Sequence, residues 1–504
     1  MYSSRNAAPL EEPADPLSGV TGHGVWQMAA ILLPGLYTVV LVAYLLRTLG
    51  PAGYAPWAIA AAVVGWLALL DAGLSITTTR DAARAVAGDR DAVARVLTAN
   101  GAYGVLGGVA VTSGVLIALV IPLILRLGGA EAVQAWLVGA LLTLDLGIVL
   151  ATAGWAGTVR GMRRFDIQLA VNVVQVAVAG ALVVALLPRF GLVGAAVAQP
   201  AGRLGARALL GVLLWRQLPW FRARPRVPRM SELRVVGAFS LPLMAWHVAR
   251  EIGIGTDLII VGAAAGATEV GLFAAGSQLI RYVGLFLFPA VAVLLPSFAA
   301  AGYTRPELVP ALLRRGVFLA AFVGASVYGG FALQATAVLE LWSGQASELS
   351  TQVLILYAIT WALITPPYVM ALMLVAQGRH RLFGMVVVVE ALVNLTVSII
   401  LVQLIGPIGV ALATAIVMTA DWIVVVPLLT ARELHIPLQP MLAAAGLGLA
   451  SGAALIAVIN TVPVGGLAGL VVRGALGAVA LGVSLTIGVR ASRKMASLRR
   501  SPSA

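Results

Sequence analysis

The sequence predicts an all-α polytopic membrane protein with about fourteen transmembrane helices, built as two pseudo-symmetric six-helix lobes plus two C-terminal helices. Three observations predict this fold: the composition, a series of apolar runs of membrane-spanning length, and an internal repeat. Of the 504 residues, 61% are hydrophobic and 11% are charged, and the mean hydropathy is +1.00. Soluble domains are nearer half apolar and a quarter charged. The chain therefore lies mostly within the bilayer.

Apolar runs of the length that crosses a bilayer recur along the whole chain. A helix spans the hydrocarbon core with about 20 apolar residues. The predicted spans are 23–46, 54–77, 98–124, 132–158, 166–187, 190–215, 236–263, 269–298, 316–341, 350–376, 382–404, 407–430, 440–460 and 467–489. The loops between them are too short for the catalytic loop that a glycan ligase or an acyltransferase needs, which argues against a membrane enzyme.

Residue types that are missing exclude several further classes. The chain has no cysteine, so disulfides, iron–sulfur clusters and thiolate zinc sites are excluded. Lys494 is the only lysine, and no Gly-Lys-Ser/Thr phosphate-binding loop exists. We expect no cofactor and no metal, and no ATP hydrolysis by this chain alone.

Arginine is distributed unevenly between the predicted loops. If the N-terminus is cytoplasmic, the cytoplasmic segments hold 25 Arg and Lys residues and the outer segments hold 4. This imbalance predicts a bacterial plasma (inner) membrane protein with both termini in the cytoplasm. It also explains the net charge of +13 without nucleic acid. We expect the basic segments to contact anionic membrane lipids.

The same segments define the predicted domain organisation. We expect a disordered cytoplasmic tail (1–22), an N-lobe (23–217), a basic cytoplasmic linker (218–235), a C-lobe (236–430), helices 13 and 14 (431–489) and a basic cytoplasmic tail (490–504). Residues 80–95 predict a short amphipathic helix on the cytoplasmic membrane surface.

The two lobes are predicted from a repeat at an offset near 215. The segment that starts at Gly50 (GPAGYAPWA) is echoed at Gly266 (GATEVGLFA), and GLVGAAVA at Gly191 is echoed by GPIGVALA at Gly406. GMRRF at Gly161 is echoed less closely by GRHRL. Because each copy holds six spans, both copies run the same way through the membrane. Two such bundles around a central cleft are typical of alternating-access transporters.

These motifs resemble one family. LGPAGY at 49–54, LDAGL at 70–74, TDLII at 256–260, GRHR at 378–381 and GPIGVALAT at 406–414 are similar to the Wzx-type polysaccharide flippases. These belong to the multidrug/oligosaccharidyl-lipid/polysaccharide exporter superfamily, and lipid II flippases are relatives. The resemblance covers roughly residues 25–430, with Ala55 where the family usually has Gly.

The resemblance implies a function and partners. A protein of this family moves an undecaprenyl-pyrophosphate-linked glycan from the cytoplasmic to the outer leaflet, for cell-surface polysaccharide biosynthesis, and is not an enzyme. Its partners are the lipid-linked oligosaccharide and, as further candidates, a polysaccharide polymerase or glycosyltransferases. The alternatives are a lipid II flippase, a multidrug or cation antiporter of the same superfamily, a membrane enzyme, and a scaffold that does not transport.

Ionisable residues within the spans mark the candidate site, because each costs about 2.5–3.5 kcal/mol at bilayer depth and so faces a partner or a wet cavity. Span 236–263 holds four: His247, Arg250, Glu251 and Asp257. At 100° per residue, Arg250 and Asp257 lie about 20° apart and His247 about 60° from Arg250. Arg281 lies near the middle of the next span. By the resemblance, these two helices line the central cavity.

Two interpretations of these charges stay open. In the first, Arg250 and Arg281 hold the pyrophosphate, because guanidinium groups bind phosphate with paired hydrogen bonds. Glu251 and Asp257 then neutralise the empty site. In the second, the charges pair permanently and fasten the two helices together. His247 is either a proton-coupling group or a hydrogen-bonded interfacial residue.

A second set of charges is predicted to act as a gate or a lobe network. Its members are Asp71, Arg80, Asp145, Arg203 and Arg207. We expect Asp145 to pair with Arg203, and Asp71 to cap a helix or to form an inner gate with Arg80. Near the other end of the chain, a packing network is predicted for Glu390, Asn394 and Asp421.

Overall fold

The computed structural model describes residues 20–71, 74–222, 251, 255–292, 294–295, 298–299, 303, 306–379, 381–462, 466, 468–469, 471–480 and 482. Within this part of the chain the regular elements are all helical. Ten of them are long and apolar enough to cross a membrane. Two of the ten contain a kink at a glycine and so comprise two helices each. The all-helical, polytopic prediction is confirmed.

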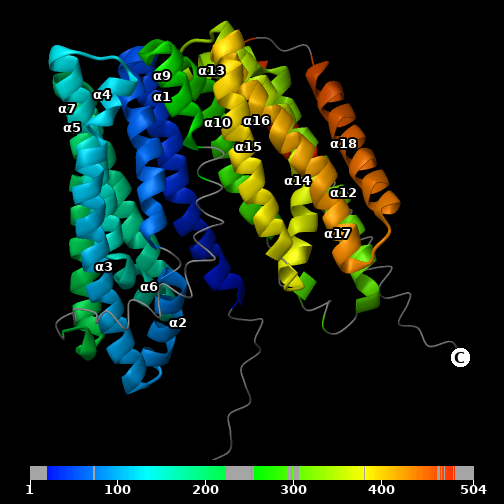
Figure 1. The fold of residues 1–504 in the computed structure, drawn as a ribbon. Coiled ribbons are helices and arrows are strands. Elements are labelled where there is room, and N and C mark those ends of the chain that lie inside the picture. The colour runs from blue at the N-terminus through cyan, green and yellow to red at the C-terminus, as the bar shows by residue number, and fades with distance from the viewer. Residues whose placement is uncertain are drawn as a thin grey trace, which may run out of the picture.

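The N-terminal bundle contains the helices up to residue 222 (Figure 1). Its elements are α1 (Val20–Leu67), η1 (Ala68–Asp71), α2 (Leu74–Val86), α3 (Arg90–Ile117), α4 (Val120–Ile124), α5 (Gly129–Ala151), α6 (Ala153–Gly161), α7 (Phe165–Gln217) and η2 (Pro219–Arg222). The kink in α1 is at Gly50 and the kink in α7 is at Gly191. Helix α7 packs against both α1 and α5, and α5 packs against α3.

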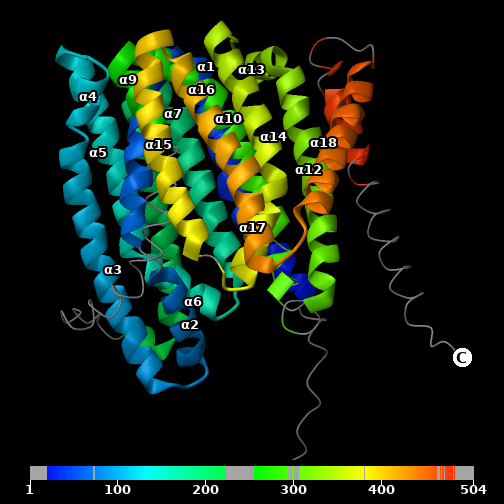
Figure 2. The same cartoon turned by 45° about the vertical axis from the view of Figure 1, so that its right-hand side comes forward.

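The C-terminal bundle lies beside the first (Figure 2). Its elements are α9 (Asp257–Ala265), α10 (Ala267–Ala292), η3 (Pro306–Leu308), α12 (Val309–Leu333), α13 (Ala335–Ser343), α14 (Glu348–Ala376), α15 (Arg381–Ile405), α16 (Ile408–Ala420), the π-helical η4 (Asp421–Val425), α17 (Val426–Leu434) and α18 (Leu438–Asn460). Helix α18 packs against α12, outside the repeated part of the chain. The two bundles meet through α1 and α10.

Backbone geometry confirms that the two bundles are repeats. Residues with positive φ occur in pairs at an offset of 215 or 216: 50 and 266, 129 and 344, 163 and 378, 191 and 406. Seven of these eight are glycine, which adopts positive φ without the steric cost of a Cβ atom. Both copies therefore turn at the same places, and the motifs that repeat in the sequence include three of these four turns.

One predicted element differs from the structure. The surface helix predicted over 80–95 is instead α2, which ends at Val86, followed by the start of α3. Gly88 has φ +100°, and the Asp89 carboxylate accepts hydrogen bonds from the backbone N–H groups of Asp91 and Ala92. Gly88, with its left-handed backbone, ends α2, and Asp89 caps α3. Residues 80–95 therefore form parts of two helices joined by a turn instead of one surface helix.

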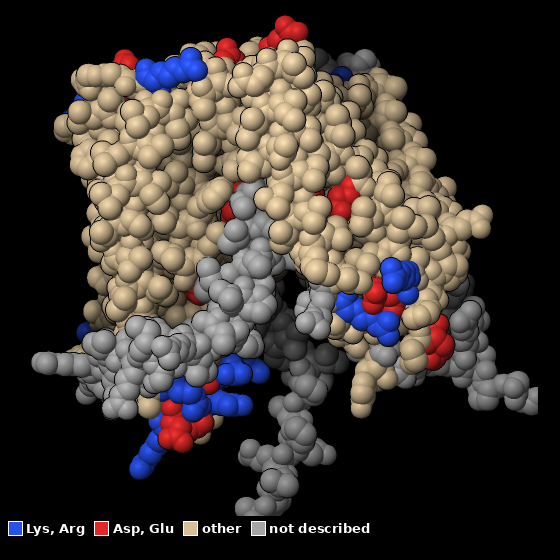
Figure 3. All heavy atoms as spheres, viewed as in Figure 1, with Lys and Arg blue, Asp and Glu red and all other residues tan. Residues whose placement is uncertain are grey.

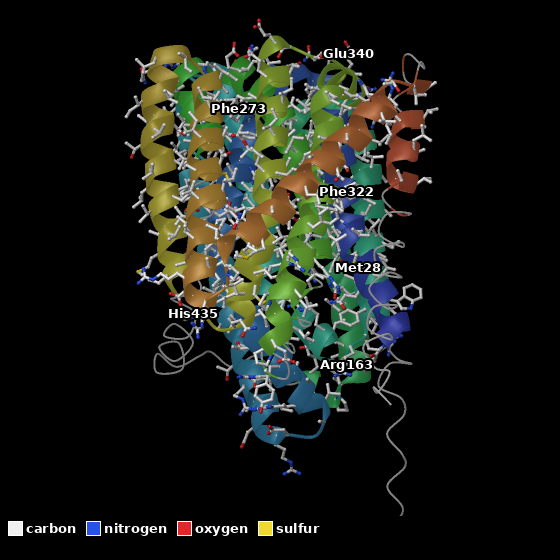
Figure 4. All side chains as sticks on the ribbon, turned by 90° about the vertical axis from the view of Figure 1, so that its right-hand side faces the viewer. Met28, Arg163, Phe273, Phe322, Glu340 and His435 are labelled. Carbon is white, nitrogen blue, oxygen red and sulfur yellow. The ribbon has the colours of Figure 1, made fainter. Side chains whose placement is uncertain are left out.

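Charged side chains gather at the two ends of the molecule, and an almost uncharged band separates them (Figure 3). One end, which we call the arginine-rich end, carries Arg80–Arg95, Arg160–Arg164, Arg379 and Arg432. The opposite, arginine-poor end carries Arg47, Arg126 and Glu340. Figure 4 shows Arg163 and His435 toward one end and Glu340 at the other. The apolar band between the ends identifies a multi-pass membrane protein.

Among the described residues, the hydrophobic core that the two bundles share lies in the arginine-poor half. One cluster there joins residues of both bundles, among them Leu45, Tyr54, Phe273 and Leu354. In the arginine-rich half the core splits into separate clusters, one within the C-terminal bundle and others within the N-terminal bundle. Among the described residues, the bundles therefore share one core at the arginine-poor end and have separate cores toward the other end; the ribbons of the described helices diverge in the same direction (Figure 1).

Hydrogen bonds between the bundles reinforce the seal. The Tyr54 hydroxyl lies 2.7 Å from Gln278 Oε1, and Trp342 Nε1 donates to Val39 O at 3.1 Å. Arg47 donates to backbone carbonyl oxygens at the end of α13. Arg126 donates to Ala263 O at 2.7 Å. All four contacts lie in the arginine-poor half.

Candidate functional site

A cavity of about 910 Å³ lies between the bundles, in the middle and the arginine-rich half of the molecule. It lies beneath the shared core, where the bundles begin to separate. Its wall is formed by α1, Glu251, Gly255, Leu258, α10, α14, α15, α16 and η4. Most of the wall therefore comes from the C-terminal bundle, and the N-terminal bundle contributes only the second half of α1.

The face that α1 presents to the cavity contains only small side chains. Ala58, Ala61, Ala62 and Gly65 all line it. Their spacing of three and four residues places them on one face of the helix. The cavity exists on this side because no large side chain projects from that face.

Arg281 is the cationic side chain of the wall among the described residues. It lies near the middle of α10, and its electrostatic field reaches Tyr54, Asp257 and Tyr282. Among the residues that the structure describes, none forms an ion pair with it. Because Arg281 lines the cavity, its guanidinium brings a positive charge to an anion that enters.

Glu251 brings an acidic group to the same cavity. Its Oε2 lies so close to Gly65 that a Cβ atom at that position would be 3.1 Å away. The carboxylate of one bundle thus touches the backbone of the other. His247 and Arg250 lie outside the described residues, so of the four ionisable groups predicted on this helix only Glu251 and Asp257 can be placed.

Asp257 lies behind the cavity wall. It is 4% exposed, and the Tyr357 hydroxyl donates to its Oδ2 at 2.6 Å. Thr414 Oγ1 lies 3.3 Å from the same oxygen, and Asn394 joins this network through Thr414. These partners fasten α9 to α14, α15 and α16. In this structure these partners enclose the Asp257 carboxylate behind the cavity wall, and its role as a substrate contact stays a prediction.

The network predicted for Glu390, Asn394 and Asp421 is divided. Asn394 belongs to the cluster around Asp257, whereas Glu390 lines the cavity. The Glu390 carboxyl lies beside Asp421, and Trp422 is next to both. Asp421 Oδ2 and Trp422 Nε1 are buried and have no partner in hydrogen-bond geometry among the described residues. Both belong to the π-helical η4, and π-helical turns are frequent at functional sites.

Four aromatic rings form a continuous part of the wall, and the sequence analysis did not find them. Phe288, Trp361, Tyr368 and Trp422 all line the cavity. The ring centroids of Phe288 lie 4.6 Å from Tyr368 and 5.2 Å from Trp361, and those of Tyr368 and Trp422 are 6.3 Å apart. We call these four residues the aromatic wall. One or two of these rings in each predicted span carried no signal, because the wall forms only when α10, α14 and η4 pack together.

In the N-terminal bundle, Arg203 and Asp145 form a bidentate ion pair, with Nε–Oδ1 and Nη2–Oδ2 distances of 2.9 and 2.8 Å. Arg203 also donates to Gln175 Oε1 at 2.9 Å. Arg207, one turn further along α7, has a buried Nε without a partner among the described residues. The structure thus brings α5 together with both halves of α7 through Arg203. The role of these three residues as a lobe network stays a proposal.

Asp71 and Arg80 have different partners. The Tyr103 hydroxyl donates to Asp71 Oδ1 at 2.9 Å, whereas Arg80 Nε lies 3.8 Å from Asp81 and its side chain is 62% exposed. Asp71 is at the end of η1, and Arg80 is in the middle of α2, two turns further on. The expected contact between them is therefore replaced by contacts to Tyr103 and Asp81.

The described residues contain no cluster of three or more His, Cys, Asp and Glu that could hold a metal ion. The described lining of the cavity provides one guanidinium (Arg281), two carboxyl groups (Glu251 and Glu390) and the aromatic wall. Such a site can bind an amphipathic molecule with an anionic group and a face that packs on aromatic rings.

Similarity to known proteins defines the class of the molecule. It has the all-helical fold of a membrane transporter. The structure is similar to one described as "Lipid II flippase MurJ, inward closed conformation", with a TM-score of 0.70, 13% identity, and coverage of 93% of this chain and 99% of that one. It is also similar to an inward-facing multidrug resistance MATE family transporter of the MOP superfamily, with a TM-score of 0.65, 17% identity, and coverage of 87% and 100%.

A third similar structure is a MOP superfamily transporter from Pyrococcus furiosus, described as having a reverse polarity of its binding pocket (TM-score 0.59, 17% identity, coverage of 84% and 96%). No curated protein sequence matches this chain. The sequence model of one family, described as "Polysaccharide biosynthesis protein", matches residues 22–301. This chain belongs to that polysaccharide biosynthesis family.

Proposed function

We propose that this protein is a flippase that moves an undecaprenyl-pyrophosphate-linked glycan from the cytoplasmic to the outer leaflet by alternating access. The observation that carries the proposal is Arg281, a guanidinium without an ion-pair partner among the described residues, in a cavity between two repeated bundles. A pyrophosphate needs cationic partners away from bulk water. Membership of the polysaccharide biosynthesis family supports a glycan as the other part of the substrate.

The orientation follows from the positive-inside rule, which assigns the arginine-rich end and both termini to the cytoplasm. The cores of the described helices are separate toward that end, which supports a cavity that opens to the leaflet on which the substrate is assembled. The headgroup enters between the lobes and Arg281 binds the pyrophosphate, while the isoprenoid tail stays in lipid. The lobes (23–217 and 236–430) then rock against each other. No bond is made or broken, so the protein is a transporter and not an enzyme.

The test is leaflet transfer in vesicles. The purified protein is reconstituted with a fluorescent undecaprenyl-pyrophosphate glycan, and a membrane-impermeant quencher reports the fraction in the outer leaflet. Arg281→Gln should slow transfer about tenfold to a hundredfold, since a hydrogen bond to a charged group contributes about 1.5–3 kcal/mol. Arg84→Gln is the matched control, because Arg84 is exposed in α2. If Arg281→Gln transfers at the normal rate, Arg281 does not hold the pyrophosphate.

A multidrug or cation antiporter is the second candidate, and the composition of the cavity wall favours it. Glu251, Glu390 and the aromatic wall are the groups that bind a planar organic cation. Against it stands Arg281, which repels a cation in the same cavity. The two candidates differ in one measurement: the antiporter would move ethidium into the same vesicles and leave the lipid-linked glycan in place.

A further inference from the structure

We propose that the aromatic wall is a sugar-binding subsite, which packs on the pyranose ring next to the pyrophosphate while Arg281 holds the phosphate groups. This inference rests on the proposed function and assigns the glycan part of the substrate to particular residues. The wall consists of Phe288, Trp361, Tyr368 and Trp422, from α10, α14 and η4.

The chemistry of a pyranose fits such a wall. A sugar ring carries C–H groups on its faces and hydroxyl groups around its rim. Aromatic faces are electron-rich and attract the weakly positive hydrogens of C–H groups. Successive rings of the wall are 4.6–6.3 Å apart. The wall is therefore a continuous apolar surface that presents several ring faces and edges to a ligand.

Polar groups lie where the sugar rim would need them. Glu390 lines the cavity beside Trp422, so its carboxyl can accept from a hydroxyl group of a sugar on the wall. Trp422 Nε1 lies beside the same carboxyl, so Glu390 and Trp422 together give this edge of the aromatic wall its polar groups.

The distance between the two subsites matches the two parts of such a headgroup. Phe288 is seven residues beyond Arg281 in α10, so both lie on nearly the same face, about 10.5 Å apart along the axis. A diphosphate joined to one pyranose ring extends over about this length. The ring nearest the carrier can therefore rest on Phe288 and Tyr368 while Arg281 contacts the phosphates.

Arg281 disfavours an organic cation in this cavity. It supplies a positive charge to the same cavity that the aromatic wall lines. A cationic ligand on the wall would meet Arg281, whereas an uncharged ring would not.

The experiment compares two carriers that differ only in the sugar. The full chain in lipid nanodiscs is titrated with undecaprenyl pyrophosphate and with undecaprenyl-pyrophosphate-linked N-acetylglucosamine, and the ratio of the two Kd values reports the sugar contribution. In Phe288→Leu and in Tyr368→Leu this ratio should fall about threefold to tenfold, the effect of one aromatic contact. Phe190→Leu is the matched control, because Phe190 is 63% exposed on α7.

Two further variants keep the result interpretable. Tyr368→Phe retains the ring and should retain the ratio, which separates stacking from a folding defect. Arg281→Gln should weaken both carriers equally and leave the ratio unchanged. If the ratio of the two Kd values is unchanged in both leucine variants, the aromatic wall is not a sugar subsite. The same conclusion follows if Tyr368→Leu loses ethidium binding while its Kd ratio stays normal. Failure of the wild-type chain to bind either carrier refutes the proposed function itself, whereas equal affinity for both refutes only this inference.

Discussion

Removing one partner of the Arg203–Asp145 ion pair should destabilise the protein more than removing both. The side chains are only 20% and 15% exposed, so little solvent screens them. Arg203→Leu leaves Asp145 without the two hydrogen bonds at 2.9 and 2.8 Å and leaves Gln175 without a donor at 2.9 Å. Breaking a buried pair costs about 3–5 kcal/mol, and an isolated aspartate at the centre of a membrane helix costs about 2.5–3.5 kcal/mol. We expect a loss of about 3 kcal/mol.

The double variant Asp145→Leu/Arg203→Leu removes both charges and should cost about 1 kcal/mol or less, because a buried ion pair replaced by apolar residues is often neutral. The implied coupling is about 2 kcal/mol or more, above the ~0.6 kcal/mol average for interhelical hydrogen bonds in membranes. The assay is unfolding by SDS in mixed micelles, followed by far-ultraviolet circular dichroism. Arg207→Leu is the internal comparison and should be neutral or stabilising, since Arg207 Nε has no partner among the described residues. Equal losses in Arg203→Leu and Arg207→Leu, or a coupling below about 0.5 kcal/mol, would refute this reasoning.

Three other perturbations have clear expected outcomes. Ala62→Leu fills the small-residue face of α1, so it should block glycan transfer in the vesicle assay while expression stays normal. The control Ala177→Leu, on the exposed face of α7, should transfer the glycan normally. Gly271→Ala places a Cβ 2.0 Å from the Pro51 carbonyl oxygen and should lower the folded yield by size-exclusion chromatography; a normal yield would contradict direct backbone contact there. Asp89→Ala should speed amide exchange in the first turn of α3. Hydrogen bonds from backbone N–H groups lower the pKa of Asp89 in the folded state below its unfolded value of 3.8. The cap is therefore complete above pH 3.8, and it is lost as the pH falls through the lower pKa of the folded state. Exchange in this turn that does not change on acidification would contradict the cap.

The parts of the fold that sequence predicted well depend on local patterns. Apolar runs gave the spans, and glycine-rich motifs gave the repeat, because a turn with positive φ needs glycine wherever it recurs. The continuous α1 and α7 were predicted as two spans each, with their break at or near Gly50 and Gly191. The division of residues 80–95 was missed because helical periodicity continues across Gly88 and hides the cap at Asp89.

The candidate site was predicted less completely, since it depends on which faces of distant helices meet. Rare intramembrane charges led to Arg281 and Glu251, which the structure places on the cavity wall. The same signal also selected Asp257, whose buried partners Tyr357 and Thr414 are remote in sequence. The aromatic wall had no sequence signal of its own, because aromatic residues are common in membrane helices.

The core shared by the two bundles has a further consequence for the cell. Backbones approach closely at Gly271 and Pro51, and Tyr54, Phe273 and Leu45 are completely buried around this contact. Among the described residues, this dry core closes the arginine-poor end above the cavity. Moving one charge through 100 mV is worth about 2.3 kcal/mol, so even a narrow leak would dissipate the membrane potential. A closed core at this end is what lets a cell hold many copies of such a protein while the bilayer stays an electrical insulator.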